Sequence, residues 1–166
     1  MTSTPTRAVL ALRQAGVPFT LHEVETPIAP GDARSRDAGS YGEAVARVLG
    51  VDPARMFKTL VVAVDGRLVC ALVPVAASLD LRALASACGG RRASLADPVE
   101  AERATGYVVG GISPFGQRRR LPVVADRSLL DGPTVLVNGG RRGLQVALAP
   151  ADLVALTGAT LAGIAR

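Results

Sequence analysis

Few residues in this sequence are of a type that could carry chemistry. Lys58, in the stretch "ARMFKTLVVAVDG", is the only lysine, and the other 18 of the 19 lysine and arginine residues are arginines. His22 is the only histidine, which excludes most sites that pair a histidine with a serine or cysteine nucleophile or with a metal. Cys70 and Cys88 lie in apolar stretches without C-x-x-C spacing. We therefore expect two buried thiols that act as small hydrophobic side chains, and no metal or cofactor.

Two glycine-rich segments have a pattern that could bind an anion. In "GYVVGGISPFGQ", Gly110 and Gly111 follow a short β-like run and allow the backbone to approach a ligand, while Pro114 and Gly116 stiffen and turn the loop. Exposed amides in such a loop can hold an anion or stabilise an oxyanion. The segment "VNGGRRGLQV" repeats the order of strand, Gly-Gly, two arginines and strand. A plain turn in the first segment and an ordinary hairpin tip in the second are equally compatible with the residues.

The net charge of +5 is concentrated in three clusters of arginines beside turn-like residues, at 91–92, 118–120 and 141–142. Such a charge suits an anionic partner such as nucleic acid. Aromatic residues make up only 3% of the chain, which argues against a platform that stacks bases. If nucleic acid binds, phosphate contacts should dominate, and the alternative for each cluster is a solvated loop.

The elements that must position these residues are short and alternate along the chain. Asp65-Gly66 between two β-branched runs predicts a hairpin with a type I′ turn, and Lys58 stands at the start of its first strand. Residues 26–40 are rich in Pro, Gly, Asp and Ser and predict a long loop. We expect helices over 4–16, 41–49, 80–88, 97–105 and 150–158, with Asp80 and Asp97 as N-cap candidates for the third and fourth. Further strands are expected over 19–24, near Tyr107, and over 121–126, 134–138, 144–149 and 160–165.

Length and composition predict one domain over residues 1–166. With 49% hydrophobic and 20% charged residues, the chain can bury a core. The strands are too many for a doubly wound sheet, so we predict an α/β fold of the α+β type, with a mixed, barrel-like sheet and helices outside. The sequence starts without a signal-peptide pattern, and no run approaches the roughly 20 apolar residues of a membrane span. We therefore expect a cytoplasmic protein with no membrane partner.

The stretches "FKTLVV", "TGYVVGGISPFGQRRRLPVV" and "VNGGRRGLQVALAPADL", in this order, resemble the YbaK/EbsC family, the free-standing relatives of the prolyl-tRNA synthetase editing domain. The resemblance covers nearly the whole chain. It implies a mixed, barrel-like sheet with surrounding helices, and hydrolysis of mischarged aminoacyl-tRNA, typically Cys-tRNA(Pro), in trans to the synthetase. The implied partners are tRNA and, through it, prolyl-tRNA synthetase. No metal or cofactor is implied.

The resemblance also implies the roles of individual residues. Lys58 corresponds to a lysine thought to hold the 3′ end of the tRNA, and a compact ammonium fits a narrow pocket better than a planar guanidinium does. An exposed strand residue is the alternative for Lys58. Gly110 and Gly111 match glycines whose backbone lies against the aminoacyl group. Further candidates for substrate binding are Tyr41, Thr59, Ile112, Ser113, Pro114, Asn138, Gly139 and Gln145, and candidates for tRNA binding are Arg118, Arg119, Arg120, Arg141 and Arg142.

Three departures from the family pattern bear on the choice of aminoacyl group. Asn138 stands where relatives have serine, Gln145 where they have aspartate, and Val24 where they often have tyrosine. The loop over 26–40 also looks longer than usual. Because these positions line the pocket in relatives, the reaction class follows from the resemblance more firmly than the aminoacyl selectivity does.

No nucleophile with a neighbouring base is evident in the chain. The resemblance implies substrate-assisted deacylation, in which the cysteinyl thiol attacks its own ester, and Gly110 and Gly111 donate backbone N–H groups to the oxyanion. Two alternatives are an Ala-tRNA(Pro) deacylase of the same family that uses a bound water, and a non-catalytic protein that binds tRNA or a synthetase.

Overall fold

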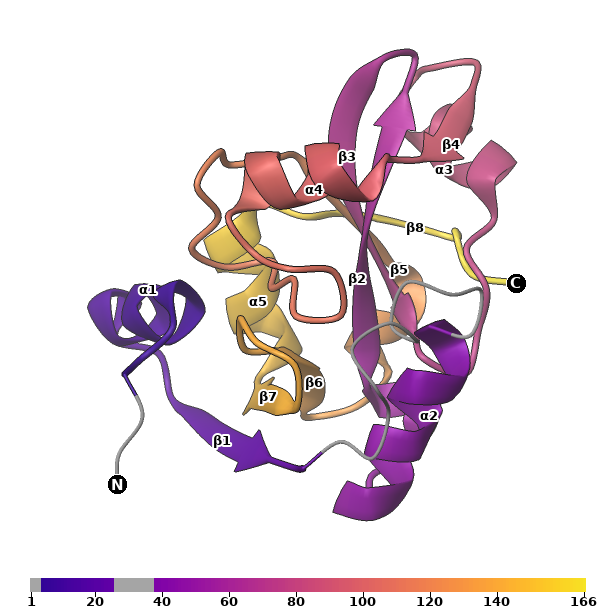
Figure 1. Cartoon of the computed structure of the whole chain (residues 1–166). Helices are drawn as coiled ribbons and strands as arrows, with labels where there is room; N and C mark the ends of the chain where they lie inside the picture. The colour runs from indigo at the N-terminus through magenta and orange to yellow at the C-terminus, as the bar shows by residue number, and fades with distance from the viewer. Residues whose placement is uncertain (1–3, 26–37) are drawn as a thin grey trace.

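The computed structural model describes residues 4–25 and 38–166, which form five α-helices and eight strands (Figure 1). Helices and strands alternate as the sequence pattern indicates, so the predicted α/β class is confirmed. The helices are α1 (Arg7–Ala15), α2 (Ala38–Leu49), α3 (Leu81–Ala87), α4 (Pro98–Thr105) and α5 (Pro150–Thr157). The strands are β1 (Phe19–Glu23), β2 (Phe57–Val64), β3 (Arg67–Pro74), β4 (Ala93–Leu95), β5 (Val123–Asp126), β6 (Val135–Asn138), β7 (Leu144–Leu148) and β8 (Thr160–Ala162). Two 3-10 helices in the described residues cover Pro53–Arg55 and Arg127–Asp131.

The strands form two sheets, in the orders β4-β2-β3-β5-β8 and β1-β7-β6. Strand β5 runs parallel to β3 and β8, and the other pairings are antiparallel, so the predicted mixed character is confirmed. A bridge between Met56 and Leu136 connects the start of β2 to β6 of the other sheet. The barrel-like expectation therefore takes the form of two adjoining sheets.

The hairpin that carries Lys58 forms as predicted. Asp65 and Gly66 have φ angles of 49° and 83°, the positive values that a type I′ turn requires. The carboxylate of Asp65 also accepts hydrogen bonds from the N–H groups of Arg91 and Arg92, both at 3.0 Å, and these bonds lower the pKa of Asp65. The turn thus fixes both the register of β2 and β3 and the course of the "GGRR" segment before β4.

Local signals at the helix ends agree with the structure in most places. Asp80 and Asp97 cap α3 and α4 by accepting a backbone N–H, and Gly16 and Gly106 end α1 and α4 in the left-handed conformation. The start of α1 differs from the expectation: the helix begins at Arg7 rather than at residue 4, because Thr6 accepts the N–H of Val9 and caps it there.

Three further expectations on the elements were wrong. Helix α2 begins at Ala38 rather than at residue 41, because the glycine and serine of its first turn have weak helix propensity and so conceal the helix start in the sequence. The last three residues of the expected loop 26–40 therefore belong to α2, and residues 26–37 lie outside the described part. No strand begins at Tyr107, where the chain enters an irregular loop, and β4 was not expected at all.

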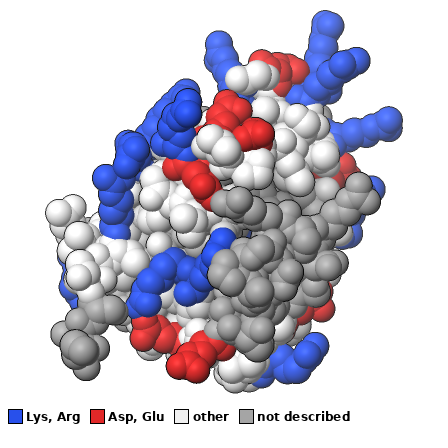
Figure 2. Space-filling view, viewed as in Figure 1, with Lys and Arg blue, Asp and Glu red and all other residues white. Residues whose placement is uncertain are grey.

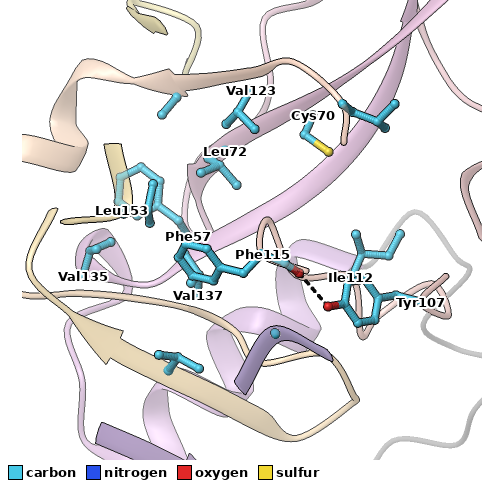
Figure 3. Packing of buried hydrophobic residues seen from close by; sticks show 14 of the residues in the cluster. Phe57, Cys70, Leu72, Tyr107, Ile112, Phe115, Val123, Val135, Val137 and Leu153 are labelled. Carbon is cyan, nitrogen blue, oxygen red and sulfur yellow. Dashed lines mark hydrogen bonds between the residues drawn. The ribbon is translucent and has the colours of Figure 1, made fainter. Parts of the chain in front are cut away.

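The main core lies between the two sheets and the helices α1, α4 and α5, with Leu12, Phe57, Leu72, Val137 and Leu153 buried in it (Figure 3). A second cluster fills the other face of the larger sheet beneath α3, and a third holds α2 against Met56 and Leu136. These contacts place α2, the start of β2 and the ends of β6 and β7 around one region. Within the described residues, no helix is both long and apolar enough to cross a membrane.

Candidate active site

A cavity of about 230 Å³ lies where α2, the start of β2, the approach to α4 and the loop after Tyr107 meet the end of β6 and the start of β7. Its walls are mostly apolar, with a few polar side chains. Six residues proposed from the sequence line it: Tyr41, Lys58, Thr59, Ile112, Asn138 and Gln145. Gly110 lines it as well. The fold thus brings together residues that are as much as 104 positions apart in the chain.

Lys58 enters the cavity from the second residue of β2, opposite Val73 of β3. Its side chain is half-buried, and burial lowers the pKa of its ammonium, while the negative charge of Glu43 acts in the opposite direction. Among the described residues, Lys58 has no hydrogen-bond or ion-pair partner. The site therefore contains a partly desolvated cation that no described residue pairs with.

Thr59 contributes a buried hydroxyl to the same wall. Its Oγ1 atom has no hydrogen-bond partner within the described residues, which is unfavourable for a buried polar atom unless a ligand or water satisfies it. On the opposite side, α2 approaches very closely: a β-carbon at Gly42 would lie 2.6 Å from Cγ1 of Val75. The absence of a side chain at Gly42 lets the neighbouring Tyr41 reach the cavity wall.

The loop over residues 107–117 forms another wall, and its two central glycines have different surroundings. Gly110 has a φ angle of 90°, which favours glycine, and its N–H makes no hydrogen bond to any described residue. The N–H of Gly111 instead donates to the carbonyl of Val108 at 2.8 Å. A β-carbon at Gly111 would lie 2.9 Å from Cα of Arg141 and from N of Arg142. Gly111 therefore allows two loops to touch, whereas the N–H of Gly110 is left without a partner in the described part of the chain.

The remainder of this loop is fixed by internal hydrogen bonds. The hydroxyl of Tyr107 donates to the carbonyl of Phe115 at 2.6 Å (Figure 3). Burial raises the pKa of Tyr107 to about 12, so that it stays a donor. Ser113 is fully buried, and its Oγ accepts the N–H of Phe115 at 3.2 Å. Neither Ser113 nor Pro114 lines the cavity, and Pro114 faces a second hollow between α1 and α5.

The tip of the β6–β7 hairpin holds the glycine loop in place. Asn138 and Gln145 are cross-strand partners, 8% and 6% exposed, and both face the cavity. The Nδ2 group of Asn138 donates to the carbonyls of Gly110 at 3.3 Å and Arg141 at 3.0 Å, and its Oδ1 accepts the N–H of Gly140 at 2.7 Å. Gly139, in contrast, continues the hairpin through its N–H bond to Leu144 and does not line the cavity.

The five arginines proposed for tRNA binding have different environments. Arg142 donates twice to the carbonyl of Val109, at 3.1 and 3.0 Å, and Arg141 forms an ion pair with Glu23. Arg120 donates to the carbonyl of Leu156 at 3.3 Å. Arg118 and Arg119 are exposed, and in the described part of the chain their guanidinium groups have no partner.

Among the described residues that line the cavity, no nucleophilic side chain is paired with a base. Cys70 is buried elsewhere, beside Gln117, and burial raises its pKa to about 11. Cys88 is exposed at the end of α3, so the expectation that both thiols are buried was wrong for this residue. The sequence window around Cys88 is apolar, but the helix ends with that side chain toward solvent. In the described residues, no three His, Cys, Asp or Glu side chains are grouped as metal ligands.

Two sets stand out among the site residues that sequence reasoning missed. Leu95, Ala96 and Pro98 line the cavity from the approach to α4, and no sequence pattern relates them to Lys58. Glu43, whose charge acts on Lys58, follows Tyr41 and Gly42 closely and could have been considered with them. The first set depends on how α4 crosses the end of the sheet, which is a property of the tertiary structure.

Comparisons with known proteins find similarity to proteins that edit or deacylate aminoacyl-tRNA. The family described as aminoacyl-tRNA editing domain matches residues 36–156. A protein of Enterococcus faecalis, provisionally named the Cys-tRNA(Pro)/Cys-tRNA(Cys) deacylase EbsC, is 34% identical over 98% of this chain and 94% of its own. The multifunctional Ser/Thr-tRNA deacylase ProXp-y of Escherichia coli is 35% identical over 75% of this chain and 77% of its own. A crystal structure provisionally described as a trans-editing enzyme for prolyl-tRNA synthetase has a TM-score of 0.82 and 27% identity, and covers 99% of both chains.

Proposed function

This chain belongs to the family of aminoacyl-tRNA editing domains, and we propose that it hydrolyses the ester of mischarged aminoacyl-tRNA, with Cys-tRNA(Pro) as the main substrate. The observation that carries the proposal is the combination in one small cavity of a free ammonium at Lys58 and a free amide at Gly110, each without a partner among the described residues. A cation and a backbone N–H are the groups needed to hold the 3′ end of an RNA and to stabilise an oxyanion. The reaction belongs to translation, and we propose the cytoplasm as its place.

The size and polarity of the cavity fit an aminoacyl group attached to the end of an RNA. A volume of about 230 Å³ with mostly apolar walls has room for a cysteinyl group together with part of the terminal nucleotide. Lys58 would contact the terminal nucleotide at the mouth, and Tyr41 would form the wall beside the side chain. Asn138 positions the Gly110 loop through its hydrogen bond, and Gln145 lies next to it.

Because the described residues of the cavity include no nucleophile paired with a base, we assign the attacking atom to the substrate. The cysteinyl thiolate attacks its own ester carbonyl, a C–S bond forms, and the C–O bond to the ribose breaks, so that the ribose oxygen leaves and takes up a proton. The product is a thiolactone, which water then opens to free cysteine. An intramolecular attack avoids the entropy cost of bringing in a second reactant, and the N–H of Gly110 stabilises the oxyanion.

A hydroxyl-bearing aminoacyl group is the second candidate. The buried hydroxyl of Thr59, unpartnered among the described residues, could form a hydrogen bond with the side chain of seryl- or threonyl-tRNA, and the Escherichia coli relative is named for these two substrates. For such substrates, and for Ala-tRNA(Pro), water would be the attacking group. Prolyl-tRNA synthetase is the partner we propose to supply the substrate, in line with the description of the similar crystal structure.

The proposal is tested by measuring deacylation of tRNA charged with Cys, S-methyl-Cys, Ser, Thr and Ala. We expect Cys-tRNA(Pro) to react fastest, the S-methylated substrate to be bound but nearly inert, and the rate to rise toward a thiol pKa of about 8.5. Ser113→Ala should retain much of the activity, because its hydroxyl is bound to Phe115 inside the loop. Hydrolysis of the S-methylated or alanyl substrate at a similar rate would assign the attack to water. Binding without turnover of any of these substrates would instead indicate a non-catalytic tRNA-binding protein.

A further inference from the structure

We propose that Arg7, Arg118 and Arg119 form a surface that binds backbone phosphates of the tRNA acceptor stem. This inference rests on the proposed function and names the part of the protein that holds the RNA beyond the cavity. Arg7 lies in the first turn of α1, more than 100 residues from the other two in the sequence. We call these three residues the basic face.

The basic face is assembled by contacts between α1, α4 and the segment after the glycine loop. The N–H groups of Arg118 and Arg119 donate to the carbonyls of Thr105 and Ala104, both at 2.9 Å, so this segment lies along the end of α4. A β-carbon at Gly106 would be 3.0 Å from Nη1 of Arg7 and 3.8 Å from Nε of Arg118. The guanidinium groups of Arg7 and Arg118, which come from distant parts of the chain, therefore both lie next to Gly106.

Some arginines of this chain bind other protein groups, whereas those of the basic face have no such partner in the described part. Arg55 donates to three backbone carbonyls, Arg142 binds the carbonyl of Val109, and Arg141 pairs with Glu23. In contrast, Arg7, Arg118 and Arg119 are exposed. None of their side chains makes a hydrogen bond or an ion pair to any described residue. Guanidinium groups that lack a carboxylate partner are well suited to phosphates, which they can bind through two N–H groups.

The basic face is continuous with the candidate active site. The hydroxyl of Thr6, next to Arg7, donates to the carbonyl of Gly139 in the hairpin tip. A β-carbon at Gly116, in the glycine loop, would lie 2.5 Å from the carbonyl oxygen of Arg7. The start of α1 thus touches both loops that border the cavity. Basic side chains line the edge between α1 and α4, while acidic ones lie over α4 (Figure 2). If the 3′ end of an RNA occupies the cavity, the basic side chains on the α1 side would attract its phosphates, and the acidic side chains over α4 would repel them.

The character of the surface also indicates which part of an RNA it binds. The whole chain has 3% aromatic residues and a net charge of +5, so it offers charge rather than rings on which bases could stack. Contacts to phosphates position an RNA without reading its bases. We therefore assign the basic face to the phosphates of the stem and the cavity to the aminoacylated end.

The test compares the triple variant Arg7→Gln, Arg118→Gln, Arg119→Gln with a control that removes the same charge elsewhere: Arg67→Gln, Arg82→Gln, Arg127→Gln. Each protein is assayed on full-length mischarged tRNA and on a short aminoacylated oligonucleotide that ends in CCA and has no stem. For full-length tRNA we expect the triple variant to raise KM at least roughly tenfold, and to flatten the log-log salt dependence by roughly 0.7 to 0.9 for each phosphate that is no longer bound. On the short substrate it should behave as the wild type does.

The following outcomes distinguish this inference from its alternatives. An unchanged salt dependence in the triple variant, or an equal change in the control, would overturn it. Arg142→Gln should lower activity on both substrates, because that side chain holds Val109 at the cavity wall. If the wild type hydrolyses neither substrate, the proposed function fails, and the salt dependence of binding to uncharged tRNA still decides whether the basic face contacts RNA.

Discussion

The side-chain amide of Asn138 donates a hydrogen bond to the carbonyl oxygen of Gly110, 3.3 Å away, and so connects the end of β6 to the glycine loop. The same amide group also binds the carbonyl of Arg141, and its oxygen accepts the N–H of Gly140. One buried side chain therefore fixes the distance between the two loops that border the cavity. The sequence suggests Asn138 as a substrate contact, and its hydrogen bonds add a positioning role.

Asn138→Ala should lower kcat/KM for deacylation roughly tenfold and destabilise the fold by about 1–2 kcal/mol, because buried carbonyls lose their donor. Asn138→Asp keeps the acceptor for Gly140 but places a carboxylate against two carbonyls, so it should be impaired as well. Thr134→Ala, an exposed change just before β6, is the control. Full activity in the alanine variant would show that the loop keeps its position without this side chain.

Lys58→Arg should lose most of the deacylation activity although the positive charge is retained. Lys58 lines the cavity wall, and a planar guanidinium is larger than an ammonium and requires a forked partner. Steady-state kinetics and urea unfolding of the same samples separate a loss of function from a loss of folding. Arg91→Lys, at an exposed turn, should change little. An arginine variant as active as the wild type would exclude the requirement for an ammonium.

Glu43→Gln should shift the effect of alkaline pH on tRNA binding to lower pH. Burial already lowers the pKa of Lys58, and Glu43 opposes that shift, so removing its charge lowers the pKa further. Lysine is cationic below its pKa, and the contribution of Lys58 to binding is therefore lost as pH rises through that value, earlier in the variant. Uncharged tRNA is the appropriate probe because it carries no thiol that titrates. Glu100→Gln, on the exposed side of α4, should leave the profile in place, and equal profiles for all three proteins would contradict the prediction.

Gly111→Ala should separate the glycine loop from the β6–β7 hairpin. The new β-carbon would lie 2.9 Å from backbone atoms of Arg141 and Arg142, which cannot rotate away as a side chain can. We expect a loss of about 1–3 kcal/mol in the free energy of unfolding, together with reduced deacylation. Gly163→Ala is the matched control, since no described atom lies within 4 Å of its β-carbon position. Equal stability of the two variants would mean that the loops can part at little cost.

The sequence alone determined the features that depend on residues close together in the chain. The Asp65-Gly66 turn and the Asp80 and Asp97 caps follow from backbone conformation and short-range hydrogen bonds, so local residue types are sufficient to predict them. The family resemblance likewise rests on contiguous motifs, and it is confirmed by the match over residues 36–156. The glycine loop and the single lysine are therefore evident from the order of residues alone.

Only the tertiary structure decided what these residues contact. Gly110 and Gly111 are indistinguishable in the sequence, yet among the described residues one has a free amide and the other packs against Arg141 and Arg142. Arginines of the same clusters likewise separate into those that bind carbonyls or Glu23 and those, such as Arg118, that remain available. Cys88 is exposed despite its apolar sequence neighbours. In each case the outcome depends on how the helices and the two sheets pack together, which brings distant parts of the chain into contact and which no local pattern encodes.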